Sequence, residues 1–107
     1  MDPKPAGVSP AFQTFLSRTP KHAQAWMEAV RGLGDASALD KKTACLAYLA
    51  VLAALRLESG VPFHARLAKD AGATCEEVAS AILVGLPAAG LGVTQTLPAA
   101  LAVFDAA

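Results

Sequence analysis

The histidine at position 64 is the clearest candidate for chemistry in this sequence. His64 shares the i, i+3, i+4, i+7 spacing of one helix face with Leu67, Ala68 and Ala71. That spacing predicts that the imidazole faces the protein interior. Because an unperturbed imidazole titrates near pH ~6.5, a histidine placed there can act as a general acid or base at neutral pH. The alternative is a core histidine whose ring is hydrogen-bonded to a backbone carbonyl.

Three further residues are candidates to act beside His64. Cys45 lies in a strongly apolar segment, where the alternative to a reactive thiol is a cysteine buried as a small hydrophobic residue. Glu58 and Ser59 precede Gly60 in a turn that joins the segments holding Cys45 and His64. A tight turn makes two helices antiparallel, so the thiol and the imidazole can line one slot that has the turn at its end. We therefore predict that His64, Cys45 and Glu58 are catalytic. We predict that Ser59 binds the substrate.

The elements that must position these residues are all predicted to be helices. Ser9-Pro10 and Thr19-Pro20 each open a helix, since proline is tolerated in the first turn, and Gly32 and Gly34 are predicted to end the second one. The segment 41–56 is apolar on all sides, which predicts a central helix packed on several faces. Further helix signals are the N-cap at Asp40, the first-turn proline at Pro62, the Thr-x-x-Glu capping box at 74–77, and the run 94–104. No segment alternates with period two for long enough to indicate a strand, so the predicted fold class is all-α.

The composition indicates one small domain with more apolar surface than it can bury alone. The chain has 107 residues, of which 54% are hydrophobic, and its mean hydropathy is +0.43. A domain of this size has a large surface for its volume. The apolar excess therefore predicts a subunit interface and a homo-oligomer. We expect a flexible N-terminal arm over residues 1–8 and a single domain over 9–107.

Several classes of partner are disfavoured by the same composition. The formal net charge is zero and the nine Lys and Arg residues are scattered, which predicts no nucleic-acid binding. The apolar runs are shorter than the roughly 20 residues that cross a bilayer, so no membrane association is expected. The first ten residues do not resemble a signal peptide, which favours a cytoplasmic location. Cys45 and Cys75 lack motif spacing, so no metal or other cofactor is predicted, and a small-molecule ligand is the expected partner.

Two segments resemble the carboxymuconolactone decarboxylase and alkyl-hydroperoxidase-D-like family. The segment 39–43, Leu-Asp-Lys-Lys-Thr, is similar to the start of the family's core helix, typically Leu-Asp-x-Lys-Thr. The segment 64–78 resembles the family's histidine helix and the Gly-Ala-Thr-x-Glu-Glu turn that follows it. The resemblance covers about residues 35–105. It implies a compact bundle of about six helices that assembles into trimers or hexamers.

The resemblance carries over the family's histidine and none of its other reactive residues. Thiol members of the family use a glutamate, a Cys-x-x-Cys pair and a histidine against peroxides. Counting back from His64, the pair falls on Leu57 and Gly60, and the glutamate falls on Cys45. A peroxidase that cycles a disulfide within the chain is therefore not supported. The decarboxylase branch also lacks the pair and keeps the histidine, and its anionic lactone would need the cations of this region, Arg56 and Arg66.

Three hypotheses about function follow. The first is an enzyme of unknown substrate, decarboxylase-like, with a small-molecule pocket around a buried His64 that acts as general acid or base. The second is a peroxidase-like thiol antioxidant enzyme, an oxidoreductase in which Cys45 is the attacking sulfur. The third is a non-catalytic oligomeric protein that binds a small molecule or a partner. A polar pocket in which His64 and Glu58 converge would favour the first hypothesis. A lowered pKa of the Cys45 thiol would favour the second. A closed slot without water between the two helices would favour the third.

Overall fold

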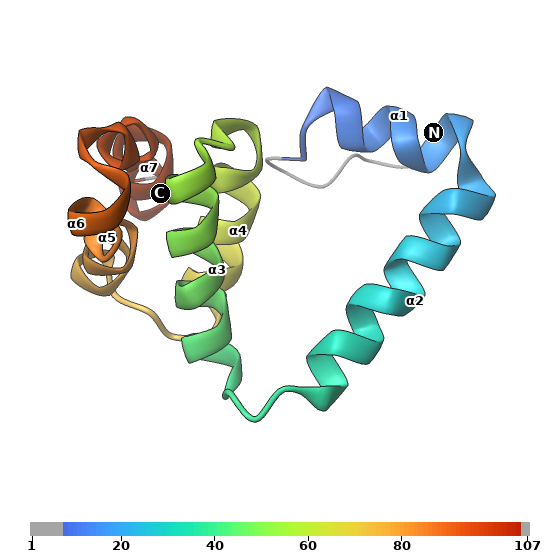
Figure 1. Ribbon diagram of the computed structural model, residues 1–107, viewed down its shortest axis with the longest axis horizontal. Helices are drawn as coiled ribbons and strands as arrows, with labels where there is room; N and C mark the ends of the chain where they lie inside the picture. The colour runs from blue at the N-terminus through green and yellow to red at the C-terminus, as the bar shows by residue number, and fades with distance from the viewer. Residues whose placement is uncertain (1–7, 106–107) are drawn as a thin grey trace.

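The computed structural model describes residues 8–105, and most of that range is helical (Figure 1). The α-helices are Pro10–Arg18 (α1), Pro20–Ala36 (α2), Lys41–Leu55 (α3), Val61–Asp70 (α4), Cys75–Leu83 (α5), Leu86–Ala89 (α6) and Leu97–Asp105 (α7). Two 3-10 helices, Glu58–Gly60 (η1) and Leu91–Thr96 (η2), precede α4 and α7. Residues 8–105 contain no strand, which confirms the all-α prediction. The predicted arm over residues 1–8 lies outside the described residues except for Val8.

Several helices begin where the sequence predicts, because their N-caps are local. The Ser9 hydroxyl accepts a hydrogen bond from the Phe12 backbone N–H at 3.1 Å, at the start of α1. The Asp40 carboxylate accepts one from Thr43 at 2.8 Å, at the start of α3. Each cap satisfies an N–H that has no partner in the first turn of its helix. Local sequence therefore decides where these helices start.

Helices α3, α4, α5 and α7 form a bundle around one hydrophobic core. Helix α3 packs against α4 and α5, and α7 packs against the same two helices. The residues without exposed surface come from all four helices and include Leu49, Ala53, Val61, Ala65, Ala68, Val78, Ile82 and Ala100. The predicted central helix is therefore present, although one of its faces, with Tyr48, Val51 and Leu55, stays exposed.

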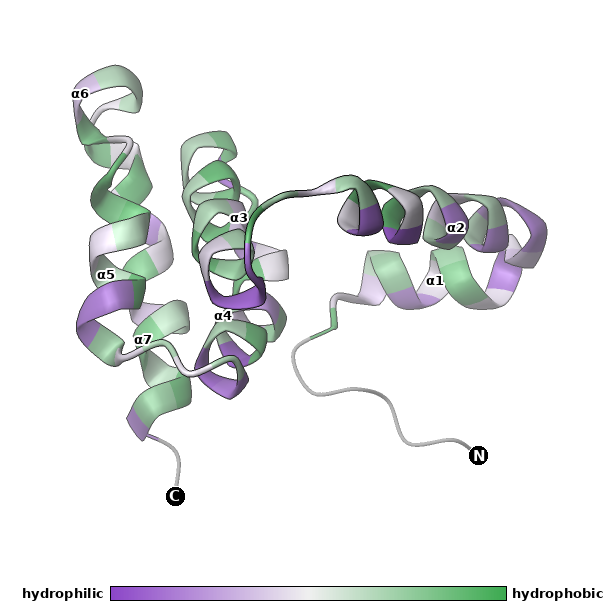
Figure 2. Ribbon diagram, turned by 90° about the horizontal axis from the view of Figure 1, so that it is seen from below, coloured by the Kyte–Doolittle hydropathy of each residue, from purple (hydrophilic) through white to green (hydrophobic). Residues whose placement is uncertain are grey.

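Helices α1 and α2 form a hairpin that projects away from the bundle (Figures 1 and 2). Ala23 is the single buried residue of these two helices. Large apolar side chains of α2 are exposed, from 40% for Met27 to 74% for Leu33. The hairpin thus buries little apolar surface within one chain, in contrast to the bundle.

Two predicted helix boundaries differ from the structure. Helix α2 does not stop at Gly32 or Gly34 but continues to Ala36. A glycine inside a helix costs only about 1 kcal/mol, which does not end the helix when nothing else competes with it. The run predicted as one helix over 94–104 is divided, with η2 ending at Thr96 and α7 beginning at Leu97. Pro98 falls in the first turn of α7, where a proline is tolerated.

Candidate functional site

His64 lies on α4, where it stacks against aromatic neighbours. Its ring centroid is 4.4 Å from that of Tyr48 on α3, with the planes inclined by 38°. The Phe63 ring meets it edge-on, at 5.2 Å and 88°. The side chain is half-buried, so it is less enclosed than the sequence suggested. Desolvation by this burial lowers the pKa of His64, because it penalises the charged imidazolium, and the ring is neutral at pH 7.

The imidazole has no hydrogen-bond partner among the described residues. No hydrogen bond contributes to its pKa shift, and desolvation is the cause. No fully buried polar side-chain atom in residues 8–105 lacks a partner, so the two ring nitrogens remain accessible from outside. A neutral imidazole offers one N–H donor and one acceptor nitrogen. Both are free for a ligand or for water.

A cavity of about 520 Å³ opens beside this ring, between the α1–α2 hairpin and the bundle. We call it the aromatic pocket, and its lining residues are Ser9, Ala11, Phe12, Phe15, Trp26, Tyr48 and His64. These side chains come from α1 and its N-cap, from α2, from α3 and from α4. None of them carries a formal charge when the imidazole is neutral. The pocket is therefore largely apolar and aromatic, with one imidazole among its lining side chains.

Cys45 does not line the aromatic pocket. Its side chain packs against the core of the bundle, beside residues such as Leu49. Burial raises the pKa of the Cys45 thiol, and Lys41 counters this shift only in part. A raised pKa reduces the thiolate fraction at neutral pH, and the thiolate is the reactive form. The condition that would favour a peroxidase-like thiol is therefore not met in this chain.

The turn residues predicted beside His64 also lie outside the lining of the pocket. Glu58 and Ser59 form η1 with Gly60, and both are exposed. The turn does reach the histidine, because a Cβ placed on Gly60 would lie 3.9 Å from His64 Cδ2. The catalytic roles of Cys45 and Glu58, and the substrate-binding role of Ser59, stay predictions.

The two arginines that an anionic ligand would need are not part of the pocket wall. Arg56 ends α3 in a left-handed conformation, with φ of 59°. Its guanidinium lies against Gly92 of η2, where any Cβ would overlap it. Arg66 is exposed on α4. An anion in the aromatic pocket would therefore meet no cation from its lining.

Sequence reasoning did not select the aromatic residues of the pocket. Phe12 and Phe15 lie on α1 and Trp26 on α2, far along the chain from the segments that hold Cys45 and His64. The sequence has four Phe, one Trp and one Tyr, and four of these six side chains, from α1, α2 and α3, face one pocket. Spacing along the chain does not contain that information, because the contacts join residues that are far apart in sequence.

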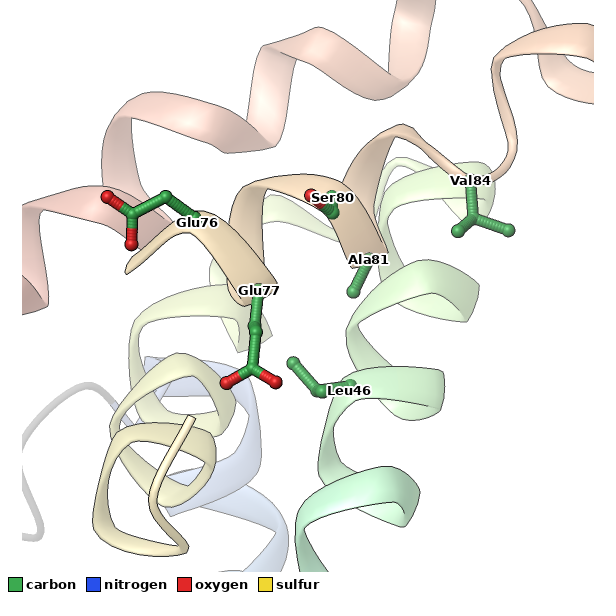
Figure 3. Close-up of a pocket in the computed structure, with 6 residues that line it drawn as sticks. All are labelled: Leu46, Glu76, Glu77, Ser80, Ala81 and Val84. Atoms are coloured by element: carbon green, nitrogen blue, oxygen red, sulfur yellow. The ribbon is translucent and has the colours of Figure 1, made fainter. Parts of the chain in front are cut away.

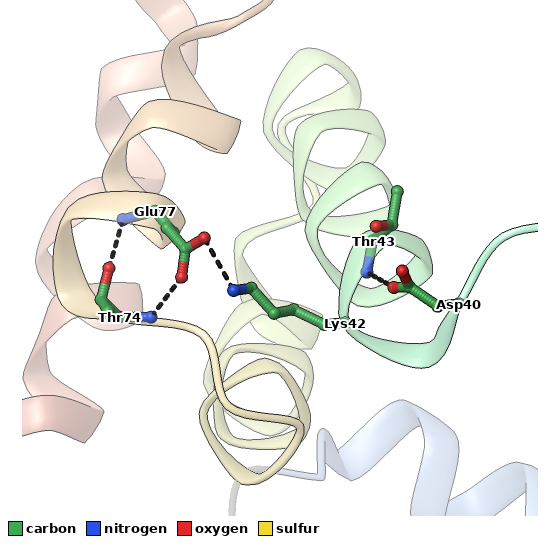
Figure 4. A network of polar contacts seen from close by, with 5 residues as sticks. All are labelled: Asp40, Lys42, Thr43, Thr74 and Glu77. Carbon is green, nitrogen blue, oxygen red and sulfur yellow. Dashed lines mark hydrogen bonds and ion pairs between the residues drawn. The ribbon is translucent and has the colours of Figure 1, made fainter.

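The residues that carry the family resemblance form a polar network at two helix N-termini (Figure 4). Thr74 and Glu77 make a reciprocal capping box at the start of α5, with bonds of 2.9 and 3.0 Å. The other carboxylate oxygen of Glu77 pairs with Lys42 of α3 at 2.8 Å. Asp40 caps α3 one turn away. These residues fix how α3 and α5 begin and meet, which is a structural role.

A second, shallower groove of about 350 Å³ lies between α3 and α5 (Figure 3). Glu76 and Glu77 are its ionisable lining residues, and the figure shows Glu76 directed away from Leu46. The Glu77 carboxylate is already bonded to Lys42 and to the Thr74 N–H, and these bonds lower its pKa. It is held as an ion, which makes it a poor base. The aromatic pocket is therefore the stronger candidate site.

Residues 8–105 contain neither a cluster of metal-ligating side chains nor a helix of membrane-spanning character. No three His, Cys, Asp or Glu side chains in this range are grouped so that they could hold a metal ion. None of its helices combines the length and the hydrophobicity needed to span a bilayer.

Comparison with known proteins identifies the family. The sequence model of the carboxymuconolactone decarboxylase family matches residues 20–106, which is most of the chain. The chain belongs to this family. No curated protein and no solved structure matches it. The match confirms the resemblance seen in segments 39–43 and 64–78, and it covers the bundle and α2 but not α1. Two of the aromatic pocket's rings, Phe12 and Phe15, thus come from outside the matched region.

Proposed function

We propose that this carboxymuconolactone decarboxylase-family protein binds a small molecule in the aromatic pocket, with the His64 imidazole as the polar contact. The observation that carries the proposal is a half-buried histidine with free ring nitrogens in the lining of an open pocket of about 520 Å³. Polar groups in such a setting normally have a partner, and here that partner is a ligand or water. Small-molecule sites are concave, largely apolar and have few polar groups, as in this pocket.

The chemistry that fits the site is proton transfer by a neutral imidazole. Because its pKa is lowered, His64 is unprotonated at neutral pH and acts first as a base, taking a proton from a ligand bound against it. Tyr48 is a second polar residue of the lining that could take part in proton transfer, because its ring stacks on the imidazole. The alternative of a non-catalytic binding protein uses the same pocket without proton transfer.

The test is substitution of the two histidines of the chain. A panel of small aromatic and aliphatic compounds is screened by ligand-observed NMR against the wild type, against His64→Asn and against His22→Asn. His22 is exposed on α2 and serves as the matched control. We expect His64→Asn to keep its helical circular dichroism and lose the binders, and His22→Asn to keep both. If His64→Asn unfolds the chain or keeps every binder, His64 is a structural residue and the proposal fails.

A further inference from the structure

The aromatic pocket has a composition that selects among classes of ligand. Four of the six Phe, Trp and Tyr side chains of the chain line it, together with His64. Two pairs of these rings contact each other. The ring centroids of Phe12 and Phe15 are 6.0 Å apart with an interplanar angle of 54°, and those of Tyr48 and His64 are 4.4 Å apart. Aromatic rings attract one another by offset or edge-on contact beyond the area they bury. The walls therefore favour a flat aromatic ring over an aliphatic one of the same size.

The uncharged lining of the pocket disfavours ionic ligands. The lining contains no Lys, Arg, Asp or Glu. A carboxylate or an ammonium group would lose water on entering the pocket without gaining an ion pair, which is unfavourable. A quaternary ammonium could still bind over the ring faces, but it has no group that hydrogen-bonds to the imidazole. It would leave the acceptor nitrogen of His64 unpaired.

We propose that the aromatic pocket binds an uncharged aromatic ring that carries a hydroxyl group, stacked among Phe15, Trp26 and Tyr48 with its O–H donating to His64. This inference rests on the proposed function and adds the class of the ligand. The hydroxyl uses the acceptor nitrogen that no described residue occupies. The ring occupies the space between the hairpin and the bundle, so residues of both regions contribute to affinity.

The test compares four compounds that share one two-ring skeleton. They are 2-naphthol, 2-naphthoate, decahydro-2-naphthol and 2-naphthyltrimethylammonium, titrated by calorimetry at neutral pH. Binding is located with the indole N–H resonance of Trp26, which is the single tryptophan of the chain. We expect 2-naphthol to bind at least about tenfold more tightly than the other three, with a shift of the Trp26 resonance. Tighter or equal binding of the anion, the cation or the aliphatic alcohol would overturn the ligand class while leaving the pocket as a binding site.

Leucine variants separate the rings of the pocket from apolar bulk. Phe15→Leu and Tyr48→Leu keep apolar volume and remove a ring, and each should weaken 2-naphthol by about two- to tenfold. Phe104→Leu on α7 is the control, since its ring lies near Lys69 and outside the pocket. Equal effects of all three variants would contradict stacking in this pocket. If none of the four compounds shifts the Trp26 resonance, the proposed function itself fails. A Trp26 fluorescence maximum at a shorter wavelength than that of a solvent-exposed tryptophan would then indicate that a second copy of the chain fills the aromatic pocket.

Discussion

The bundle and the α1–α2 hairpin differ in sequence as well as in burial, because α3, α5 and α7 are more hydrophobic than α1 and α2. Core residues such as Leu49 and Ile82 in the bundle have no exposed surface, whereas α2 has one buried residue, Ala23. Both regions contain long apolar side chains, so the more polar composition of α1 and α2 explains only part of the contrast. The bundle covers its apolar side chains with its own helices except on the open face of α3, and the hairpin leaves Trp26, Val30 and Leu33 uncovered.

This contrast shows that one chain holds two kinds of apolar surface. The first stabilises the fold directly, since apolar burial is the main favourable contribution to folding. The second is an exposed apolar patch on α2 and on the open face of α3, of the kind that marks an interaction site. The aromatic pocket lies where these two regions meet, so its shape depends on how firmly the hairpin is held.

The largest expected effect is a difference between two leucine truncations. Leu49→Ala removes a side chain with no exposed surface and should lower the free energy of unfolding by about 2–5 kcal/mol. Leu33→Ala removes one that is 74% exposed and should change it by less than about 0.5 kcal/mol in a dissociated chain. Urea denaturation followed by circular dichroism measures both. A large cost for Leu33→Ala that depends on protein concentration would show that the hairpin is buried in an assembly.

The next prediction concerns that assembly. We expect a homo-oligomer, a trimer or hexamer, because exposed apolar residues of α2 and α3 outside the aromatic pocket, such as Val30, Leu33 and Leu55, have no cover in one chain. Val30→Glu would place an unpaired charge in the interface and should reduce the mass seen by light scattering. Glu28→Gln, at an exposed site of the same helix, is the control and should leave the mass unchanged. A wild-type monomer at micromolar concentration would contradict the prediction.

A smaller effect is expected at the end of α7. The Lys69 ammonium donates to the Val103 carbonyl at 2.9 Å and lies 5.5 Å from the Phe104 ring centroid. A cation at a helix C-terminus is stabilising, so Lys69→Met should cost about 1–2 kcal/mol of unfolding free energy. Lys21→Met on the exposed hairpin is the matched control and should cost almost nothing. Equal changes in the denaturation midpoints of the two variants would show that the hydrogen bond from Lys69 to the Val103 carbonyl does not stabilise the packing of α4 against α7.

The smallest effect is a pH dependence at Glu77. The bond to Lys42, followed by the Thr74 N–H, lowers the pKa of Glu77 below its ordinary value of 4.5. A lowered pKa means that Glu77 binds its proton more tightly in the unfolded chain than in the folded one. The contribution of Glu77 to folding stability is therefore complete above its unfolded pKa, and it is lost as the pH falls through its folded pKa. Glu77→Gln should therefore lower Tm at about pH 7, and the difference should narrow toward pH ~3. A Tm difference that is constant with pH would contradict this origin.

Sequence reasoning was most successful where the determining contacts are short. Ser9, Asp40 and Thr74 bond to residues three positions on, so their helix starts can be read from adjacent letters. The same holds for the family, since segments 39–43 and 64–78 are continuous and the family model confirms it. Sequence reasoning was less successful at Gly32 and Gly34. A glycine ends a helix only where other contacts favour a different backbone conformation, and no atom lies within 4 Å of a Cβ placed on either glycine.

The candidate site shows the opposite case. The sequence by itself determined that His64 lies on an apolar helix face, because helical periodicity is a local property. Only the tertiary structure decided that His64 stacks on Tyr48, that it shares a pocket with Phe15 and Trp26, and that Cys45 packs against the core instead. The crossing of α3 and α4 and the direction of the hairpin set those contacts, and both result from packing between segments far apart in the chain. The position of the histidine was therefore predictable from its own helix, whereas the pocket beside it was not.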